Sequence, residues 1–197
     1  MKISNCKNNI TAVDIFCGAG GFTLAAKQLN INVVAAIDNN KHANETYHRN
    51  FITKKRRKPK LYANDILEIS PQTLLSELNL KSGDLDILMG GPPCQGFSTH
   101  RIKDAGVNDP RNLLLNRYFD FVRVLKPKTF IVENVSGLLW NRHKQHVDTF
   151  YRLAENSGYK VFDPVVLNAK DFGVPQNRKR VFILGIRKEL NLKINWP

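Results

Sequence analysis

Cys94 is the residue of this chain whose surroundings are best suited to chemistry. It follows the apolar run 85–89 and two prolines, and it precedes a polar loop that contains glycine. Each proline fixes its own φ angle, so the turn before the thiol is rigid. A thiol held in this way can act as a nucleophile where its thiolate is stabilised and its surroundings are open. A lone cysteine in such a turn is more often a small buried residue with no chemical role. The neighbouring motifs must therefore decide between the two interpretations.

A glycine turn after a second apolar run could bring the backbone close to a ligand. The run 12–17 ends at Gly-Ala-Gly-Gly, and an amphipathic helix is predicted over 21–29 from Leu24, Ala25 and Leu29. Glycines allow close backbone approach and leave the helix N-terminus open. The pattern GxGG differs from the GxGxxG of dinucleotide sites, which argues against a bound pyrophosphate.

A carboxylate follows the next apolar run. The run 32–37 ends at Asp38. At this distance from a glycine turn, nucleotide-binding folds hold ribose hydroxyls with an acidic residue. An ordinary strand–helix turn explains the two features equally well when they are taken alone, so that alternative stays open.

An acidic residue ends a third apolar run. Glu133 follows Phe130, Ile131 and Val132, and Asn134 comes next. Such a position is poorly solvated, and buried carboxylates are usually paired or have a raised pKa that lets them donate a proton. A solvent-facing helix cap is the alternative interpretation.

Two arginines stand at the entrance to a fourth apolar run. Arg178 and Arg180 precede the run 181–184, and because they lie two residues apart they share one face of a strand. Guanidinium groups suit the recognition of phosphate or carbonyl oxygens. A solvated basic turn is the alternative.

Taken together, these motifs resemble the cytosine-5 DNA methyltransferase family. The segments DIFCGAGGF, GGPPCQGFS, ENV and QNRKR occur in the family's order, and DPRNLLL and LNAKDFGVPQ are also similar to its members. The resemblance extends from about Ala12 to Trp196. Four ordered motifs are far more specific than any one of them would be.

The resemblance implies methyl transfer to carbon 5 of cytosine. Cys94 would add as a thiolate to carbon 6 and so make carbon 5 nucleophilic. The target atom lies inside the duplex, so the base must flip out, and Gln95 is placed to fill the gap. The base that removes the carbon 5 proton is not identified by any motif.

The remaining catalytic residues implied by the resemblance contact the flipped cytosine or support the site. Glu133 would hydrogen-bond ring nitrogen 3 and the exocyclic amine, and Arg180 would contact the carbonyl oxygen. Arg178 would serve a neighbouring phosphate or orient the site, and Asn134 would support the loop backbone.

The methyl donor implied by the resemblance is S-adenosylmethionine. Its adenine ring would contact Phe16 and Ile66, and the adenine amino group would donate to Asp65. Its ribose hydroxyls would bind Asp38. The cofactor-binding residues are expected to be Phe16, Gly18, Gly20, Gly21, Asp38, Asp65, Ile66, Pro93 and Leu114. The family often has glutamate at position 38 and an aromatic residue at position 39, where this chain has Asn39. Asp65 has an alternative role as the N-cap of a following helix.

Composition favours a polyanionic partner. The 197 residues carry a formal net charge of +13, which points to nucleic acid, and the resemblance implies double-stranded DNA. The basic run 54–60 is as consistent with a solvated segment as with DNA contact. Cys6, Cys17 and Cys94 lack metal-ligand spacing and indicate reduced thiols in a cytoplasmic protein. No apolar run is long enough to span a membrane, and no signal peptide is recognisable.

The elements that must position these residues alternate between strands and helices, which predicts one doubly wound, mostly parallel α/β sheet. The resemblance implies that this sheet is of the Rossmann-like methyltransferase type. In such a sheet ligands bind beyond the carboxyl ends of the strands. The long loop 95–110 is expected to be a mobile lid. Strands are expected at 12–17, 32–37, 61–63, 85–89, 129–133, near 160–167 and at 180–186, and helices at 21–29, 41–49, 70–79, 111–125 and 143–156.

The resemblance also implies missing parts. Family members continue into a target-recognition domain and a closing segment that covers the cofactor site, neither of which is present in 1–197. Only a largely polar decapeptide precedes the strand 12–17, with no helix to cover the neighbouring sheet face, which predicts that this face is exposed. We therefore expect a partner chain that carries those segments, or that this chain is a fragment. An RNA cytosine-5 methyltransferase and an inactive binding module remain as alternatives.

Overall fold

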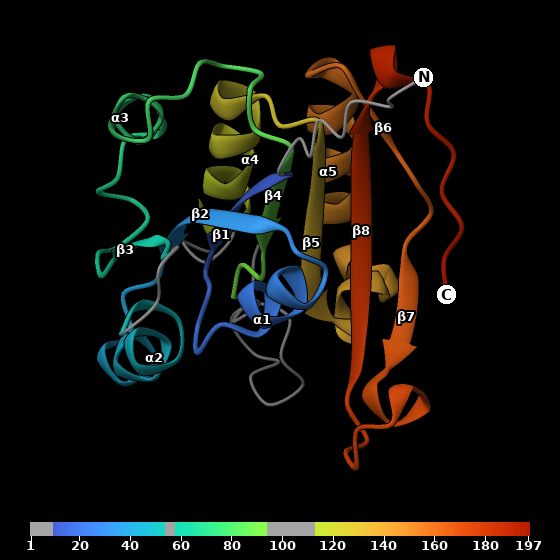
Figure 1. The fold of residues 1–197 in the computed structure, drawn as a ribbon. Coiled ribbons are helices and arrows are strands. Elements are labelled where there is room, and N and C mark those ends of the chain that lie inside the picture. The colour runs from blue at the N-terminus through green and yellow to red at the C-terminus, as the bar shows by residue number, and fades with distance from the viewer. Residues whose placement is uncertain (1–9, 54–57, 94–112) are drawn as a thin grey trace, which may run out of the picture.

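Short β-branched and apolar runs alternate with helices along the chain, and the runs assemble into one eight-stranded sheet with helices against its faces (Figure 1). The computed structural model describes residues 10–53, 58–93 and 113–197. The strands are β1 (Thr11–Ile15), β2 (Asn32–Ile37), β3 (Lys60–Tyr62), β4 (Ile87–Gly90), β5 (Thr129–Val135), β6 (Tyr159–Val161), β7 (Val165–Asn168) and β8 (Lys179–Arg187). The α-helices are α1 (Gly21–Gln28), α2 (Lys41–Tyr47), α3 (Pro71–Glu77), α4 (Leu113–Leu125) and α5 (Lys144–Asn156).

Strands β1 and β4 lie side by side near the centre of the sheet. The order is β3-β2-β1-β4-β5-β8-β6, and β7 pairs with β8. The pairings from β3 to β5 are parallel, whereas β8 runs antiparallel to its three neighbours. The chain order reverses between β1 and β4, and the crevice at such a reversal is where open α/β sheets bind ligands. The expected mostly parallel α/β fold is confirmed.

One face of the sheet carries the main core, on which α3, α4 and α5 pack. Phe130 of β5 lies at its centre, with its ring centroid 6.1 Å from Phe119, 5.9 Å from Phe150 and 5.2 Å from Tyr159. A side chain at Gly185 of β8 would overlap the Phe130 ring. The absence of a Cβ on this strand therefore allows the aromatic cluster to sit close to the sheet.

The opposite face, beside α1, is covered less completely. We expected the exposed area beside β1, but β1 is buried from Ala12 to Ile15. Half-buried apolar side chains instead lie on β4, β5 and β8, at Ile87, Ile131, Phe182 and Leu184. The apolar side predicted for α1 was also wrong, because Leu24 and Leu29 are exposed whereas Thr23 and Ala26 are buried.

Several element boundaries differ from those expected. The first strand ends at Ile15, because Phe16 adopts a left-handed conformation with φ of 58°. The strand expected at 129–133 continues to Val135 through its pairing with β8, so Glu133 lies within the strand and not at its end. The single strand expected near 160–167 is two, β6 and β7.

Helical segments also depart from the prediction. Helix α2 ends at Tyr47, and a π-helix follows it directly over His48–Ile52. Short 3₁₀ turns cover Ser136–Leu139, Asn141–His143, Ala169–Phe172 and Lys188–Leu190.

The expected lid at 95–110 and the basic residues 54–57 lie outside the described residues. Within the described ranges, no helix is long and apolar enough to cross a membrane.

Candidate functional site

A cavity of about 150 Å³ opens where β1, β2, β3 and β4 end. The turns after these strands and the beginning of α4 form its walls. Its lining residues are Phe16, Ile37, Asp38, Asn39, Asn64, Asp65, Ile66, Pro93 and Leu114. The structure thus brings together six of the nine residues that the sequence pointed to for cofactor binding. Of the other three lining residues, Ile37 and Asn64 were not foreseen, and Asn39 was noted only as a departure from the family.

The two carboxylates of the cavity are tied to its backbone. Asp38 accepts hydrogen bonds from the amides of Gly18 and Asn40, each at 2.8 Å. Asp65 accepts from the amide of Leu67 at 2.9 Å, which forms a turn and not the helix cap considered as its alternative. Each carboxylate oxygen can accept a second hydrogen bond, so both groups keep capacity for a ligand.

The glycine turn lies beside the cavity but is absent from its lining. Gly18 has φ of 53°, and no described atom lies within 4 Å of a side chain placed there or at Gly21. Gly20 has φ of 99°, and a side chain there would overlap the Phe51 ring. Gly20 is therefore required for packing against the π-helix, whereas Gly18 and Gly21 leave open space.

An acid–arginine cluster lies where β5 meets β8. The Oε1 atom of Glu133 lies 2.9 Å from Nε of Arg180 and 3.6 Å from a terminal nitrogen of Arg178. The Glu133 side chain is 24% exposed, so it is partly desolvated and paired at the same time. The two arginines thus share a face, as their spacing indicated.

Three consecutive residues connect the acid–arginine cluster to the cavity. Gly91 faces Glu133, since a side chain on Gly91 would lie 3.4 Å from Oε2. The side-chain amide of Asn134 donates to the carbonyl oxygen of Pro92 at 3.2 Å. Pro93 lines the cavity. The residues that follow, Cys94 and Gln95, lie outside the described residues.

A buried acid beneath the glycine turn was missed by the sequence analysis. Asp14 of β1 is fully buried, and its Oδ2 accepts from the amide and the hydroxyl of Thr23 at 3.1 and 2.7 Å. The Thr23 hydroxyl lies 2.9 Å from the Tyr47 hydroxyl. Burial raises the pKa of Asp14 to about 7, although the bonds from Thr23 oppose the shift. The sequence did carry a signal for this acid, because Asp14 lies inside an apolar run and a buried carboxylate there needs a hydrogen-bonding partner.

The sequence matches a known protein family over nearly its whole length. Residues 10–197 match the model for C-5 cytosine-specific DNA methylase. The chain therefore belongs to the C-5 cytosine-specific DNA methylase family.

Curated relatives share more than a third of their aligned residues with this chain. Identity is 37% to the Type II methyltransferase M.XorII of Xanthomonas oryzae, over 91% of this chain and 41% of that protein. It is 39% to M.FnuDI of Fusobacterium nucleatum, over 91% of this chain and 48% of that protein. The chain thus spans about half the length of the curated relatives it matches.

Solved structures share the fold. A DNA modification methyltransferase encoded within an E. coli prophage superposes with a TM-score of 0.80 at 28% identity, covering 94% of this chain and 49% of that one. EhMeth of Entamoeba histolytica superposes with a TM-score of 0.71 at 23% identity, covering 96% of this chain and 56% of that one. The second likeness shows the fold alone.

Proposed function

We propose that this chain carries the catalytic half of an enzyme that transfers a methyl group from S-adenosylmethionine to carbon 5 of cytosine in DNA. The observation that carries the proposal is the segment Gly91–Pro93. One end of this segment faces Glu133, the other lines the cavity, and Cys94 is the next residue. A methyl donor in the cavity and an acceptor base at Glu133 would therefore lie at the two ends of the segment that leads into Cys94.

The cavity fits the adenosine end of the proposed cofactor. Phe16, Ile66 and Leu114 offer apolar surface to a planar base. Asp38 and Asp65 offer acceptors for ribose hydroxyls and for an exocyclic amine. When bound, S-adenosylmethionine supplies an electrophilic methyl group. Gly18 and Gly21 leave room beside the cavity for the methionine portion.

The acid–arginine cluster would hold the acceptor ring. In the proposed step the Cys94 sulfur would bond to carbon 6, carbon 5 would take the methyl group, and S-adenosylhomocysteine would leave with the electron pair of the broken sulfur–methyl bond. Glu133 would hydrogen-bond the ring edge, and Arg180 would stabilise charge that develops on the carbonyl oxygen. A base then removes the carbon 5 proton, the electron pair restores the ring double bond, and the sulfur leaves.

The supporting residues act on the backbone and on the duplex. Asn134 would hold the Pro92 carbonyl and so fix the turn before the nucleophile. Arg178, half-exposed beside Glu133, would contact a neighbouring phosphate. Gln95 would fill the space vacated by the flipped base.

The test is incorporation of labelled methyl from S-adenosylmethionine into duplex DNA, with Cys94→Ala as the matched control. Incorporation that requires Cys94 supports the proposal, and transfer to RNA in preference to DNA would redirect it. DNA containing 5-fluorocytosine adds a second readout, because the final elimination cannot occur there. A covalent protein–DNA complex that survives denaturant is then expected with the wild type and not with Cys94→Ala.

We also propose that a further segment or chain covers the α1 side of the sheet. Half-buried Ile87, Ile131, Phe182 and Leu184 support this proposal, because monomers rarely leave connected apolar area open. Analytical ultracentrifugation and binding of an apolar dye test it on this chain. Self-association or dye binding is expected, and a stable, dye-negative monomer would contradict the proposal.

A further inference from the structure

The turn that supplies two walls of the cavity lacks regular secondary structure of its own. Asp65 and Ile66 line the cavity, yet the segment between β3 and α3 is a series of turns. Inside the segment, the amide of Leu67 donates to the Asp65 side chain at 2.9 Å and that of Glu68 to its carbonyl at 3.0 Å. These bonds shape the turn but do not attach it to the rest of the fold.

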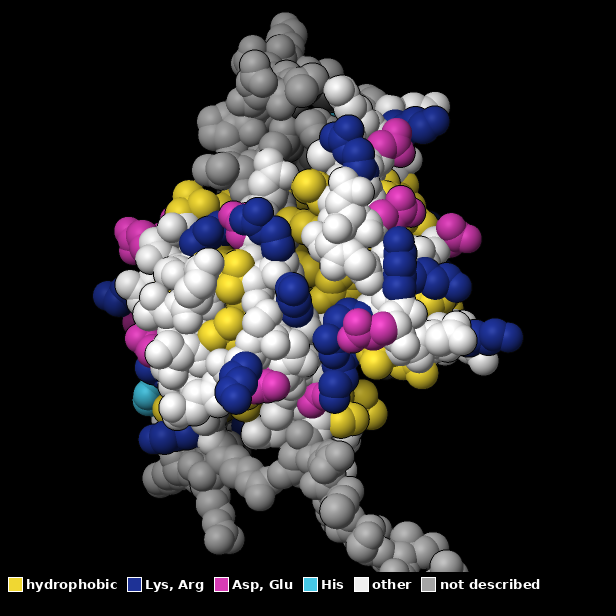
Figure 2. All heavy atoms as spheres, turned by 90° about the horizontal axis from the view of Figure 1, so that it is seen from above, with side chains coloured by type: hydrophobic (Ala, Val, Ile, Leu, Met, Phe, Trp, Pro, Cys, Tyr) yellow, Lys and Arg dark blue, Asp and Glu magenta, His cyan; other side chains and the backbone are white. Residues whose placement is uncertain are grey.

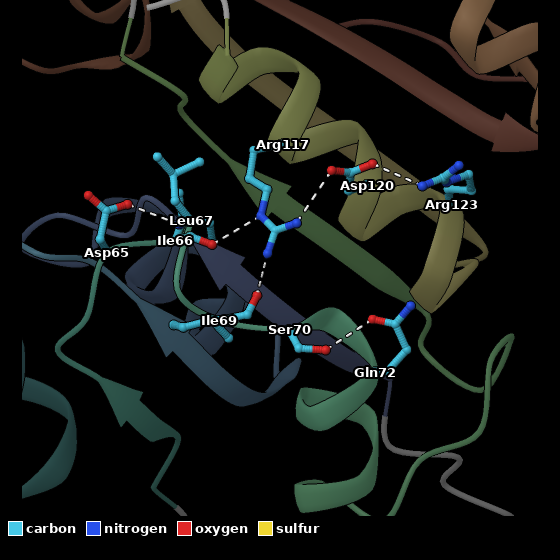
Figure 3. Close-up of polar contacts among 9 residues, drawn as sticks. All are labelled: Asp65, Ile66, Leu67, Ile69, Ser70, Gln72, Arg117, Asp120 and Arg123. Atoms are coloured by element: carbon cyan, nitrogen blue, oxygen red, sulfur yellow. Dashed lines mark hydrogen bonds and ion pairs between the residues drawn. The ribbon is translucent and has the colours of Figure 1, made fainter. Parts of the chain in front are cut away.

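Arg117 of α4 makes that attachment (Figure 3). Its Nε donates to the carbonyl oxygen of Ile66 at 3.1 Å, and one terminal nitrogen donates to that of Ile69 at 2.7 Å. The other terminal nitrogen lies 3.4 Å from Asp120. The side chain is 19% exposed, so these charge-assisted bonds form in a largely desolvated place.

The same helix supplies the facing wall of the cavity. Leu114 lines the cavity and lies three residues before Arg117, which puts both on one side of α4. One turn of the helix thus provides an apolar wall and fixes the segment opposite to it. Asn39 also donates to the Asp65 side chain at 3.3 Å and Ile66 packs in the main core, so the arginine adds its backbone hydrogen bonds to these contacts.

We propose that Arg117 is a positioning residue for the adenine end of the cofactor cavity. It holds the turn that carries Asp65 and Ile66 through the backbone carbonyls of Ile66 and Ile69, and it touches no ligand itself. The inference rests on the proposed function, since it is Asp65 that would accept from the adenine amino group. Lysine cannot replace this arginine fully, because only a planar guanidinium presents donors in a fixed fork.

The test compares Arg117→Met with Arg123→Met. Arg123 also pairs with Asp120, at 3.1 Å, but it is 69% exposed and makes no described contact with the turn. Binding of S-adenosylhomocysteine and of its hypoxanthine analogue, which lacks the adenine amino group, is measured by calorimetry. Hydrogen exchange of the Leu67 and Glu68 amides is followed without ligand.

For Arg117→Met we expect about tenfold weaker binding of S-adenosylhomocysteine, a smaller preference over the hypoxanthine analogue and faster amide exchange in the turn. Arg117→Lys should recover part of each effect, and Arg123→Met should match the wild type. A simple loss of stability would accelerate exchange throughout the sheet and would weaken both ligands equally, which would overturn the inference. Unchanged binding and preference in Arg117→Met would also overturn it and would leave the proposed function standing.

If the wild type binds neither nucleoside, the proposed cofactor function fails for this chain. The inference is then decided by exchange alone. Protection of Leu67 and Glu68 that is lost in Arg117→Met but kept in Arg123→Met supports the positioning role, and equal protection in all variants overturns it.

Discussion

Asp38 accepts hydrogen bonds from two backbone amides and also lines the cavity. Its bonds to Gly18 and Asn40 fix the glycine turn relative to β2. Asp38→Ala should therefore lose both the turn and the ribose contact, and we expect the Kd for S-adenosylhomocysteine to rise about tenfold or more. Calorimetry measures the change. Glu68→Gln, an exposed position near the cavity, is the control, and an equal effect of both substitutions would contradict the expectation.

Asp14 gives the fold a specific pH dependence. In the unfolded chain this carboxyl ionises near its ordinary pKa of 3.8, whereas burial raises the pKa in the folded chain to about 7. Between about pH 4 and 7 the folded state therefore binds more protons than the unfolded state, and its stability falls as the pH rises. The ionisation of Asp14 alone should lower the free energy of unfolding by roughly 4 kcal/mol between these two pH values.

Asp14→Asn should remove that contribution. Urea unfolding at pH 4, 6 and 8 gives the free energy of unfolding of wild type and variant. We expect the variant's stability to fall less steeply with pH than that of the wild type, whatever constant offset the substitution adds. Parallel pH profiles would show that Asp14 keeps its charge when the chain folds.

At the scale of elements, β8 depends on a glycine for its contact with the aromatic cluster. In Gly185→Ala the added methyl would overlap the Phe130 ring, so we expect a loss of about 1–3 kcal/mol in the free energy of unfolding. Denaturant titration measures it. Adding Phe130→Leu should relieve part of the strain, so the double variant should be more stable than the sum of the single changes predicts.

Elements were predictable from the sequence where a local run determined them. The run 32–37 is β2 as expected, and the polar ends of neighbouring runs do meet at one cavity. The extent of β5 was not predictable, because its last residues are held by pairing with β8 rather than by their own apolar character. The exposure of Leu24 and Leu29 was missed for a similar reason, since it depends on what covers α1.

The candidate site was predictable only in part. Residues that touch the cavity with their side chains carry motif signals, as Phe16 and Asp38 do. Arg117 acts on carbonyl oxygens of a turn that lies far away in sequence, and no local pattern marks such a contact. Glu133 was identified, but its pairing with two arginines requires the antiparallel register of β5 and β8.

At the scale of the whole molecule, the net charge of +13 should govern DNA affinity. On the face shown in Figure 2, Lys and Arg stand among Asp and Glu and form no continuous positive surface. Some of these charges form pairs, such as Lys128 with Asp86 at 2.6 Å, and the net charge already includes both partners of each pair. The excess of Lys and Arg over the whole sequence should nevertheless favour contacts with the phosphates of a duplex.

Such contacts release counterions, so DNA binding should weaken steeply with salt. We expect roughly tenfold or more loss of affinity between 50 and 200 mM salt. Fluorescence anisotropy on a labelled duplex measures it. Cys94→Ala should show the same slope, because that residue carries no charge in the phosphate contacts. An affinity that does not respond to salt would exclude this mode of binding.

The segment Gly91–Pro93 has a thermodynamic consequence. Any occupant of the cavity that shifts Pro93 also shifts the carbonyl held by Asn134, beside Glu133. If the proposed roles hold, the two ligands are linked in free energy. The factor by which S-adenosylhomocysteine changes the affinity for an extrahelical cytosine must then equal the factor by which that cytosine changes the affinity for S-adenosylhomocysteine.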